Sequence, residues 1–399
     1  MRLADLKRVE AATVWKSGRE AARLEREHDG LVFRYLDEYA GPPVAWTLPR
    51  EGAALRSRGG ALPPFFSGLL PEGRRLTALR SAIKTSADDE LSLLLAIGRD
   101  TIGDVVVLPE GLRYDEEQSS AASKPIEESD FEEVFARVLA PNPADRVGLP
   151  GVQDKVSGRM LSLPLARADS AWILKLNPPE YPHLVANEAF FLAAARASGI
   201  ESADYEVVHD RRGRQGLLVR RFDRVSQGGR LLALAQEDAC QVLGRYPADK
   251  YRVSAEEVVQ ALAERTMARV VAARSLIQQL AFAYLTCNGD AHAKNFSIVQ
   301  NRQWRPALAY DIPTTHPYGD TTMALQIQGR DREDIGRKDF LALGEACGVR
   351  AKAVERVLDE LVGKMPTWHD RLEELPFDAR TVHKLRKACS YRADRLRGL

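Results

Sequence analysis

The chain has 399 residues, of which 45% are hydrophobic and 28% are charged, and its formal net charge at pH 7 is +1. This composition is typical of a globular protein, and a chain of this length is expected to form two or three subdomains rather than one core. The near-zero net charge excludes a uniformly basic surface, so contact with nucleic acid would need a local cluster of basic residues.

Cysteine usage and hydropathy favour a cytoplasmic protein without a membrane segment. The four cysteines lie far apart in the sequence, which excludes a CxxC motif or a zinc knuckle, and we expect reduced thiols at Cys240, Cys287, Cys347 and Cys389. Residues 1–20 are charged throughout, unlike a signal peptide. Residues 269–287 are the most apolar long stretch, but they include Arg274 and two glutamines, which indicates a buried helix rather than a membrane span.

The first part of the chain, residues 1–110, predicts a small α+β subdomain. Apolar side chains recur on one face of residues 31–35, as in a strand, and residues 88–97 begin with acids and continue apolar, as in a helix. Residues 104–108 predict a further strand. The next stretch, residues 111–145, predicts a linker with a connecting helix, because residues 110–133 carry many Glu, Asp and Ser residues with little periodicity.

The remainder of the chain changes from a strand pattern to a helix pattern. Residues 146–223 predict a β-rich lobe, with strands at 159–163, 172–176 and 216–222 and one helix at about 187–198 that ends before Gly199. Residues 224–399 predict a helical lobe, with helical spacing at 255–287, 331–347, 350–364 and 379–397. A β-rich lobe followed by a helical lobe is the arrangement of a two-lobed protein kinase, so the predicted fold class is α+β.

The strongest chemical signal is the segment Asn288-Gly289-Asp290-Ala291-His292-Ala293-Lys294-Asn295, which follows a long apolar helix. An Asp followed five positions later by an Asn matches the catalytic loop of kinases, where the Asp accepts the proton of the attacking hydroxyl and the Asn holds a magnesium ion. Asp311, sixteen residues after Asn295, is placed to bridge Mg²⁺ to the phosphates. The alternative is that these residues only cap helices and form turns.

A lysine and a glutamate precede that segment in the order found in kinases. Lys175 alternates with apolar residues in a predicted strand and is expected to bind the phosphates of ATP. Glu188 lies on the following helix and is expected to pair with it. A surface lysine on an amphipathic strand is the alternative.

Three further features have weaker specificity. The loop Gly148-Leu149-Pro150-Gly151-Val152-Gln153-Asp154-Lys155 can present backbone N–H groups to phosphates, although it is neither a Walker A motif nor GxGxxG, and a plain turn is the alternative. The segment 219–224 can cross between lobes and contact adenine, or it is an ordinary strand end with salt bridges. His292 is expected to orient the loop or contact the nucleotide rather than bind zinc, and the basic residues 384–397 are expected to form a solvated helix face.

Taken in order, the segments GLPGVQDK, WILKL, NEAFFLAAARASGI, VRRFDR, QEDACQVLG, NGDAHAKNFSI and YDI resemble the HipA-type serine/threonine kinase toxins, which are partners of HipB-type antitoxins. The resemblance extends into the first region through PEGRRLTALR and LLLAIGRDTIGDVVVLPEG, and so covers nearly the whole chain. It implies a two-lobed, kinase-like fold with an extra N-terminal subdomain.

The resemblance also implies the site. Asp290 would be the proton acceptor, and Asn295 and Asp311 would be the Mg²⁺ ligands. Together with the residues above, the site for ATP and Mg²⁺ would comprise Pro150, Gly151, Val152, Gln153, Asp154, Lys155, Lys175, Glu188, Arg220, Arg221, Phe222, His292, Lys294, Asn295, Tyr310 and Asp311.

Members of the resembled family phosphorylate a serine of an aminoacyl-tRNA synthetase and assemble with a DNA-binding antitoxin that represses their operon. The resemblance therefore implies such a protein substrate, a HipB-type partner, and contact with operator DNA mainly through that partner. Two positions depart from the family pattern. Gly148 replaces the serine that many members autophosphorylate, which puts that self-inhibition in doubt, and Arg220 stands where an acidic residue is common. A small-molecule kinase resembling the aminoglycoside kinases, or a nucleotide-binding co-repressor, are the alternatives.

Overall fold

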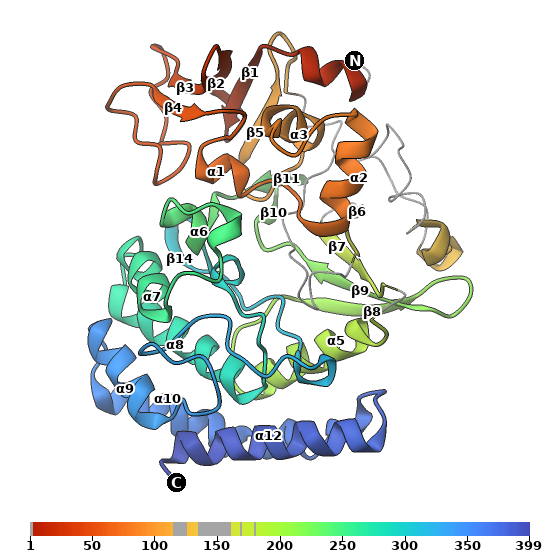
Figure 1. The fold of residues 1–399 in the computed structure, drawn as a ribbon, viewed down its shortest axis with the longest axis vertical. Helices are drawn as coiled ribbons and strands as arrows, with labels where there is room; N and C mark the ends of the chain where they lie inside the picture. The colour runs from red at the N-terminus through yellow and green to blue at the C-terminus, as the bar shows by residue number, and fades with distance from the viewer. Residues whose placement is uncertain (1–2, 115–125, 135–160, 168–169, 179–180) are drawn as a thin grey trace. The chain divides into compact units, whose positions relative to one another are not determined.

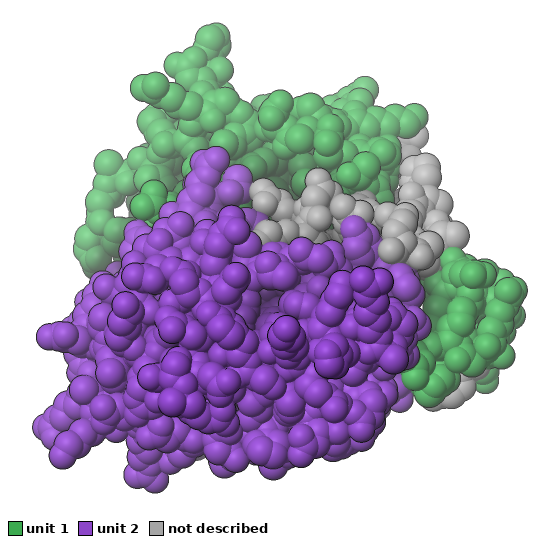
Figure 2. Space-filling view, turned by 60° about the horizontal axis from the view of Figure 1, so that its bottom comes forward, with its two compact units in different colours: residues 1–154, 161–176, 208–247 green, residues 155–160, 177–207, 248–399 purple. Residues whose placement is uncertain are grey.

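The computed structural model of the chain describes residues 3–114, 126–134, 161–167, 170–178 and 181–399. The chain divides into two compact units (Figure 2). Unit 1 comprises residues 1–154, 161–176 and 208–247, and unit 2 comprises residues 155–160, 177–207 and 248–399. The sequence-based division places boundaries at 110, 145 and 223 along the continuous chain. Each of the two units, by contrast, is assembled from three segments. The sequence-based division therefore stays a prediction.

An antiparallel five-stranded sheet forms the N-terminal part of unit 1 (Figure 1). Its order is β4-β3-β2-β1-β5, with strands β1 (Ala11–Lys16), β2 (Arg19–Glu27), β3 (Gly30–Tyr35), β4 (Leu55–Arg58) and β5 (Val105–Pro109). Helices α1 (Pro64–Ser67), α2 (Gly73–Ile83) and α3 (Glu90–Ile97) contribute to the same core. The strands predicted at 31–35 and 104–108 and the helix predicted at 88–97 are therefore confirmed within two residues.

Helix α3 shows how the local sequence fixes these boundaries. Asp89 caps its first turn, because the Asp89 carboxylate accepts a hydrogen bond from the backbone N–H of Ser92. The helix ends at Gly98, whose carbonyl accepts a 2.9 Å bond from the N–H of Val107 in β5. A Cβ atom at position 98 would lie 2.0 Å from the Val107 carbonyl oxygen, so only glycine permits this approach of α3 to β5.

A second sheet, most of which belongs to unit 1, carries the predicted phosphate-binding lysine. Its order is β6-β7-β9-β8, with strands β6 (Leu161–Arg167), β7 (Ser170–Leu176), β8 (Tyr205–His209) and β9 (Gln215–Arg220). Strand β7 runs antiparallel to both β6 and β9. A small apolar core forms where Phe131 packs with Trp172 and Leu174 of β7 and with Leu218 of β9.

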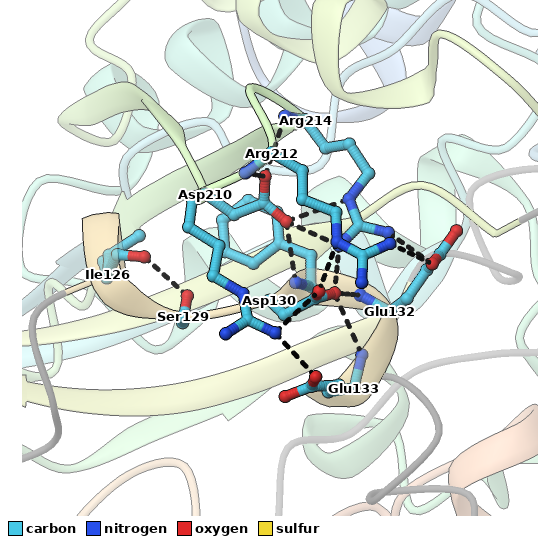
Figure 3. A network of polar contacts seen from close by, with 10 residues as sticks. Ile126, Ser129, Asp130, Glu132, Glu133, Asp210, Arg212 and Arg214 are labelled. Carbon is cyan, nitrogen blue, oxygen red and sulfur yellow. Dashed lines mark hydrogen bonds and ion pairs between the residues drawn. The ribbon is translucent and has the colours of Figure 1, made fainter.

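An ion-pair network attaches residues 126–134 to the turn between β8 and β9 (Figure 3). The carboxylates of Asp130 and Asp210 are buried, and guanidinium groups of Arg211, Arg212 and Arg214 converge on them. Asp210 also accepts a hydrogen bond of 2.8 Å from the backbone N–H of Phe131. Burial by itself raises the pKa of Asp130, but hydrogen bonds from Arg214 and its neighbours hold that pKa well below the usual range.

Helices dominate unit 2. They are α5 (Leu184–Ala197), α7 (Ala255–Glu264), α8 (Arg269–Leu285), α9 (Arg337–Ala346), α10 (Ala351–Lys364), α11 (Pro366–His369) and α12 (Ala379–Arg397). The strand pair β13 (Ser297–Asn301) and β14 (Gln303–Pro306) follows the predicted catalytic segment. Among the helices that the structure describes, none combines the length and apolar character that a membrane crossing requires.

Two helical segments are shorter than the sequence pattern indicates. Residues 255–287 form two helices, because the chain turns after Glu264, where the Thr266 hydroxyl bonds the Ala263 carbonyl and satisfies the helix end. Helix α9 begins at Arg337 and not near 331, because Asp339 accepts a hydrogen bond from the N–H of Gly336 and fixes the start there. The helices predicted at 350–364 and 379–397 are confirmed.

Candidate functional site

The predicted site residues are distributed over both units. Lys175 and Arg220–Phe222 belong to unit 1, whereas Glu188, His292–Asn295 and Asp290 belong to unit 2, as do Tyr310 and Asp311. Pro150–Lys155 and Gly148 lie outside the described residues, so the predicted nucleotide loop stays a prediction. The pairing of Lys175 with Glu188 joins two different units and also stays a prediction.

The predicted catalytic segment begins directly after α8, which is buried over its second half. Asn288 is fully buried, and its side-chain oxygen accepts a hydrogen bond of 3.0 Å from the N–H of Asp290. The N–H of Gly289 donates to the hydroxyl of Thr315 at 2.8 Å. The turn that presents Asp290 is therefore fixed by side-chain acceptors on both sides.

Gly289 is required for space rather than for an unusual backbone angle. A Cβ atom at this position would lie 2.7 Å from the Asp320 carboxylate and 2.8 Å from the Thr322 carbonyl oxygen. Because the second of these atoms is backbone, any larger residue would displace the turn. The glycine before Asp290 thus has a structural reason that the sequence motif alone does not give.

Tyr251 contacts the predicted proton acceptor. Its hydroxyl donates a 2.5 Å hydrogen bond to Oδ1 of Asp290, and its ring packs edge-on against His292 with centroids 5.2 Å apart. The backbone carbonyl of the preceding Lys250 accepts a hydrogen bond from the N–H of Ala293. Sequence reasoning missed Tyr251, because it lies 39 residues before Asp290 in no recognisable motif.

Asn295 and Asp311 are brought together by one amide group. The Nδ2 atom of Asn295 donates to the backbone carbonyl oxygen of Asp290 at 3.0 Å and to that of Asp311 at 3.4 Å. Since the amide nitrogen is used in this way, the amide oxygen is the atom that can face a metal ion. One amide and one carboxylate oxygen are ligands that Mg²⁺ accepts, with phosphate and water oxygens completing its shell.

Asp311 itself has an uncommon backbone conformation, with φ of 54°. This left-handed region is unfavourable for most residues other than glycine, and Asp and Asn tolerate it best. Among the described residues, no group of three or more His, Cys, Asp and Glu side chains is arranged to hold a metal ion.

Other contacts fix the segment that follows Asp311. The side-chain amide of Asn187 on α5 forms two hydrogen bonds with the backbone of Thr314, at 2.8 and 3.0 Å. The hydroxyls of Thr314 and Thr315 both approach the carbonyl oxygen of Cys287, at 3.2 and 3.3 Å. These positions were not predicted as site residues, and only the fold reveals that they connect the Asp290 and Asp311 segments.

Tyr310 contacts the predicted catalytic segment and the strand that follows it. Its hydroxyl donates to the backbone carbonyl of Lys294 at 2.7 Å and contacts the Ser297 hydroxyl at 2.6 Å. The phenol therefore braces the turn between Lys294 and β13.

Lys175 is only 9% exposed on β7, so the alternative of a surface lysine does not describe it.

The end of β9 carries the salt bridges that the sequence analysis gave as the alternative for segment 219–224. Arg221 is buried and its guanidinium pairs with Asp223 and Asp100, each at 2.8 Å. Burial by itself raises the pKa of Asp223, but Arg221 and Arg224 lower it to about 2.

Comparisons with known proteins support the sequence-based assignment. A family model described as the HipA-like C-terminal domain matches residues 147–369, and one described as the HipA N-terminal domain matches residues 12–108. The chain is 30% identical to the putative kinase Y4dM of Sinorhizobium fredii, over 87% of each chain. It is 28% identical to the serine/threonine-protein kinase toxin HipA of Shewanella oneidensis, over 77% of this chain and 75% of that protein.

A solved structure extends the similarity to the fold. A chain in a complex of HipA, HipB and operator DNA from Shewanella oneidensis superposes with a TM-score of 0.77. The two chains are 23% identical, and the match covers 97% of this chain and 98% of the other. The predicted α+β fold of the two-lobed, kinase-like type is confirmed by this likeness.

Proposed function

This chain belongs to the HipA family, and we propose that it is an ATP- and Mg²⁺-dependent serine/threonine protein kinase that acts as the toxin of a toxin–antitoxin pair. One observation carries the kinase assignment: the Asn295 amide bonds the backbone of both Asp290 and Asp311, so three residues predicted from spacing alone meet in one place. A curated relative named a serine/threonine-protein kinase toxin supports the coarser assignment.

Asp290 would act on the hydroxyl of the acceptor serine. Its carboxylate orients that hydroxyl and accepts the proton as the oxygen attacks the terminal phosphate. The hydrogen bond from Tyr251 to Oδ1 would hold the carboxylate in one orientation. Most of the rate enhancement would come from this positioning and from neutralisation of phosphate charge.

Asn295 and Asp311 would hold the magnesium ion, which supplies charge neutralisation on the phosphates of ATP when bound. Lys175 would bind the same phosphates, with Glu188 orienting it. The backbone of Arg220–Phe222 and the loop Pro150–Lys155 would contact the nucleotide, and His292, Lys294 and Tyr310 would complete the site.

The partners follow from the same proposal. We expect a HipB-type DNA-binding antitoxin, with operator DNA contacted mainly through it, because the structurally similar chain was solved with HipB and operator DNA. The protein substrate would be a component of translation such as an aminoacyl-tRNA synthetase. The expected location is the cytoplasm.

The test is phosphotransfer by the Asp290→Asn variant. Transfer of labelled phosphate from ATP to protein should fall at least 100-fold, the usual minimum for losing a general base, while the thermal unfolding midpoint changes little. Asp359→Asn is the matched control, because Asp359 is an exposed carboxylate whose one ion-pair partner among the described residues is Arg337. Equal transfer by Asp290→Asn and wild type would contradict the proposed role of Asp290.

The same preparation separates the alternatives. Phosphoproteomics that compares cells induced for wild type and for Asp290→Asn should identify the protein substrate. Growth should be inhibited by wild type and not by Asp290→Asn. Phosphate found on small acceptors and on no protein would instead support a small-molecule kinase, and growth inhibition that survives Asp290→Asn would support a non-catalytic co-repressor.

A further inference from the structure

Two cysteines that are 102 residues apart in the sequence meet inside unit 2. The Sγ atoms of Cys287 and Cys389 lie 4.0 Å apart in a hydrogen-bonded thiol pair, and both residues are almost fully buried. Cys389 lies on α12, whereas Cys287 immediately precedes the Asn288-Gly289-Asp290 turn and has a left-handed backbone with φ of 55°. The pair therefore joins the last helix to the loop of the proposed proton acceptor.

A buried positive charge lies beside this thiol pair. Arg392, one turn after Cys389 on α12, is 3% exposed. Its guanidinium donates to the backbone carbonyls of Tyr284 and Thr321 at 2.8 and 2.6 Å and lies over the Tyr284 ring at 4.9 Å. No carboxylate in the described part of the chain forms an ion pair with Arg392, so its charge acts on the neighbouring sulfurs without being neutralised locally.

The two sulfurs are unequal as a consequence. The hydrogen bond from Cys389 and the charge of Arg392 lower the pKa of the Cys287 thiol, whereas that hydrogen bond and burial raise the pKa of Cys389. Cys347, buried in the same unit without such neighbours, has a pKa raised to about 12 by burial. Of these thiols, Cys287 is the one whose thiolate is favoured.

We propose that Cys287 and Cys389 form a reversible disulfide that lowers the activity of the site, an inference about regulation that rests on the proposed kinase function. The proposal stands on the sulfur–sulfur contact, on Arg392, and on the connection of Cys287 to both site segments.

The oxidation balances with a small peroxide as the oxidant. The Cys287 thiolate attacks the O–O bond, forms a sulfenic acid and, after protonation of the leaving hydroxide, releases water. The Cys389 thiol then attacks the Cys287 sulfur, the S–S bond forms, and the sulfenic hydroxyl leaves as a second water. The two thiols lose two electrons to the peroxide, and an external dithiol reverses the change by thiol–disulfide exchange.

Closing the bond requires Cys287 to move, and this movement is transmitted to the proposed catalytic site. A disulfide has an S–S length of about 2.0 Å, so the sulfurs must approach by roughly 2 Å. The carbonyl of Cys287 accepts hydrogen bonds from the N–H of Thr315 and from two threonine hydroxyls, and Thr315 also holds Gly289. A shift of Cys287 toward α12 therefore displaces the Asp290 turn relative to the segment after Asp311.

The experiment exposes the full-length protein to hydrogen peroxide and then maps peptides without reduction. We expect a Cys287–Cys389 linked peptide and an at least tenfold loss of phosphotransfer that dithiothreitol recovers. Cys389→Ala should show neither the linked peptide nor the recoverable loss, whereas Cys347→Ser, a buried-thiol control, should behave as wild type.

The covalent and catalytic readouts separate the two ideas. A linked peptide in a protein without kinase activity would support the disulfide and count against the proposed function. An active kinase that forms no linked peptide, or a Cys389→Ala variant with the same recoverable loss, would overturn the disulfide. The peptide map of wild type decides the point even if Cys389→Ala fails to fold.

Discussion

The end of β9 in unit 1 and the loop after α8 in unit 2 are both buried and polar, but they are stabilised differently. At the end of β9, Asp223 accepts hydrogen bonds from Arg221, from Arg224 and from the N–H of Gly103. In the loop after α8, the backbone is held by neutral groups such as the Thr315 hydroxyl and the Asn288 and Asn295 amides.

This difference has a physical consequence. A buried ion pair opposes desolvation only while both charges are present, so removing one partner leaves an uncompensated charge. Removing one partner of a neutral hydrogen bond costs less folding free energy, because it leaves a polar group rather than a charge without a partner. We therefore expect a substitution in the loop after α8 to cost less stability than one at the end of β9.

The largest expected effect is at the ion-paired strand end. Asp223→Ala leaves the guanidinium of Arg221 with Asp100 as its one carboxylate partner among the described residues, and we expect the free energy of unfolding to fall by about 3–5 kcal/mol. Urea unfolding followed by circular dichroism measures it. Asp359→Ala, which breaks the exposed pair with Arg337, should change the same quantity by under about 1 kcal/mol. Similar losses in the two variants would contradict the comparison.

A smaller effect is expected in the neutral network. Thr315→Val keeps the side-chain shape but removes the acceptor for Gly289 N–H, and we expect a loss of about 1–3 kcal/mol in unfolding free energy. Because Gly289 precedes Asp290, kcat should also fall about tenfold through misplacement of the carboxylate, while KM for ATP changes little.

Thr367→Val is the matched control for that substitution, because the Thr367 hydroxyl bonds only the local carbonyl of Lys364 at an exposed position. It should leave kcat unchanged. A Thr315→Val variant with wild-type kcat would show that this hydroxyl does not position the loop.

A pH-dependent effect is expected at Glu237 on β12 (Gln236–Asp238), a buried carboxyl in unit 1 that accepts no hydrogen bond from a cationic group among the described residues. Its Oε1 accepts from the N–H of Trp46, whereas its Oε2 has no partner in the described part of the chain. Burial raises the pKa of Glu237 from 4.5 to about 8. The unfolded chain thus releases this proton from about pH 4.5, whereas the folded chain retains it up to about pH 8, so wild-type stability falls between these values.

Glu237→Gln does not titrate and should avoid this loss. We expect the difference in unfolding free energy between Glu237→Gln and wild type to grow in favour of the variant from pH 4.5 to pH 8, because only wild type loses stability as the carboxyl titrates, whereas the unpartnered amide group costs the variant the same at every pH. Thermal unfolding across pH 4.5 to 8 measures the difference. A constant difference across that range would contradict a raised pKa at Glu237.

Much of the fold could be predicted because it depends on local patterns. The apolar run of α8, the acidic start of α3 and the spacing of Asp290 and Asn295 are all visible in short stretches of sequence. The family resemblance, confirmed by the domain matches, added the order of these elements.

The features that could not be predicted from the sequence depend on contacts between residues far apart in the chain. Nothing in the sequence places Tyr251 against Asp290, or Cys389 against Cys287, because side-chain contacts across 39 and 102 positions arise only when the helices pack. Arg221 was predicted for its backbone at a hinge, and the pairing of its side chain with Asp100 could not be read from a segment 121 residues away.

The left-handed backbone of Asp311 decides which substitution best tests its proposed role as a metal ligand. Alanine at this φ adds roughly 1–2 kcal/mol of backbone strain to the loss of the carboxylate, so Asp311→Ala changes two things at once. Asparagine accepts the same conformation and has nearly the same shape. Asp311→Asn therefore removes the charge alone, and any difference between the two variants measures the conformation rather than the chemistry.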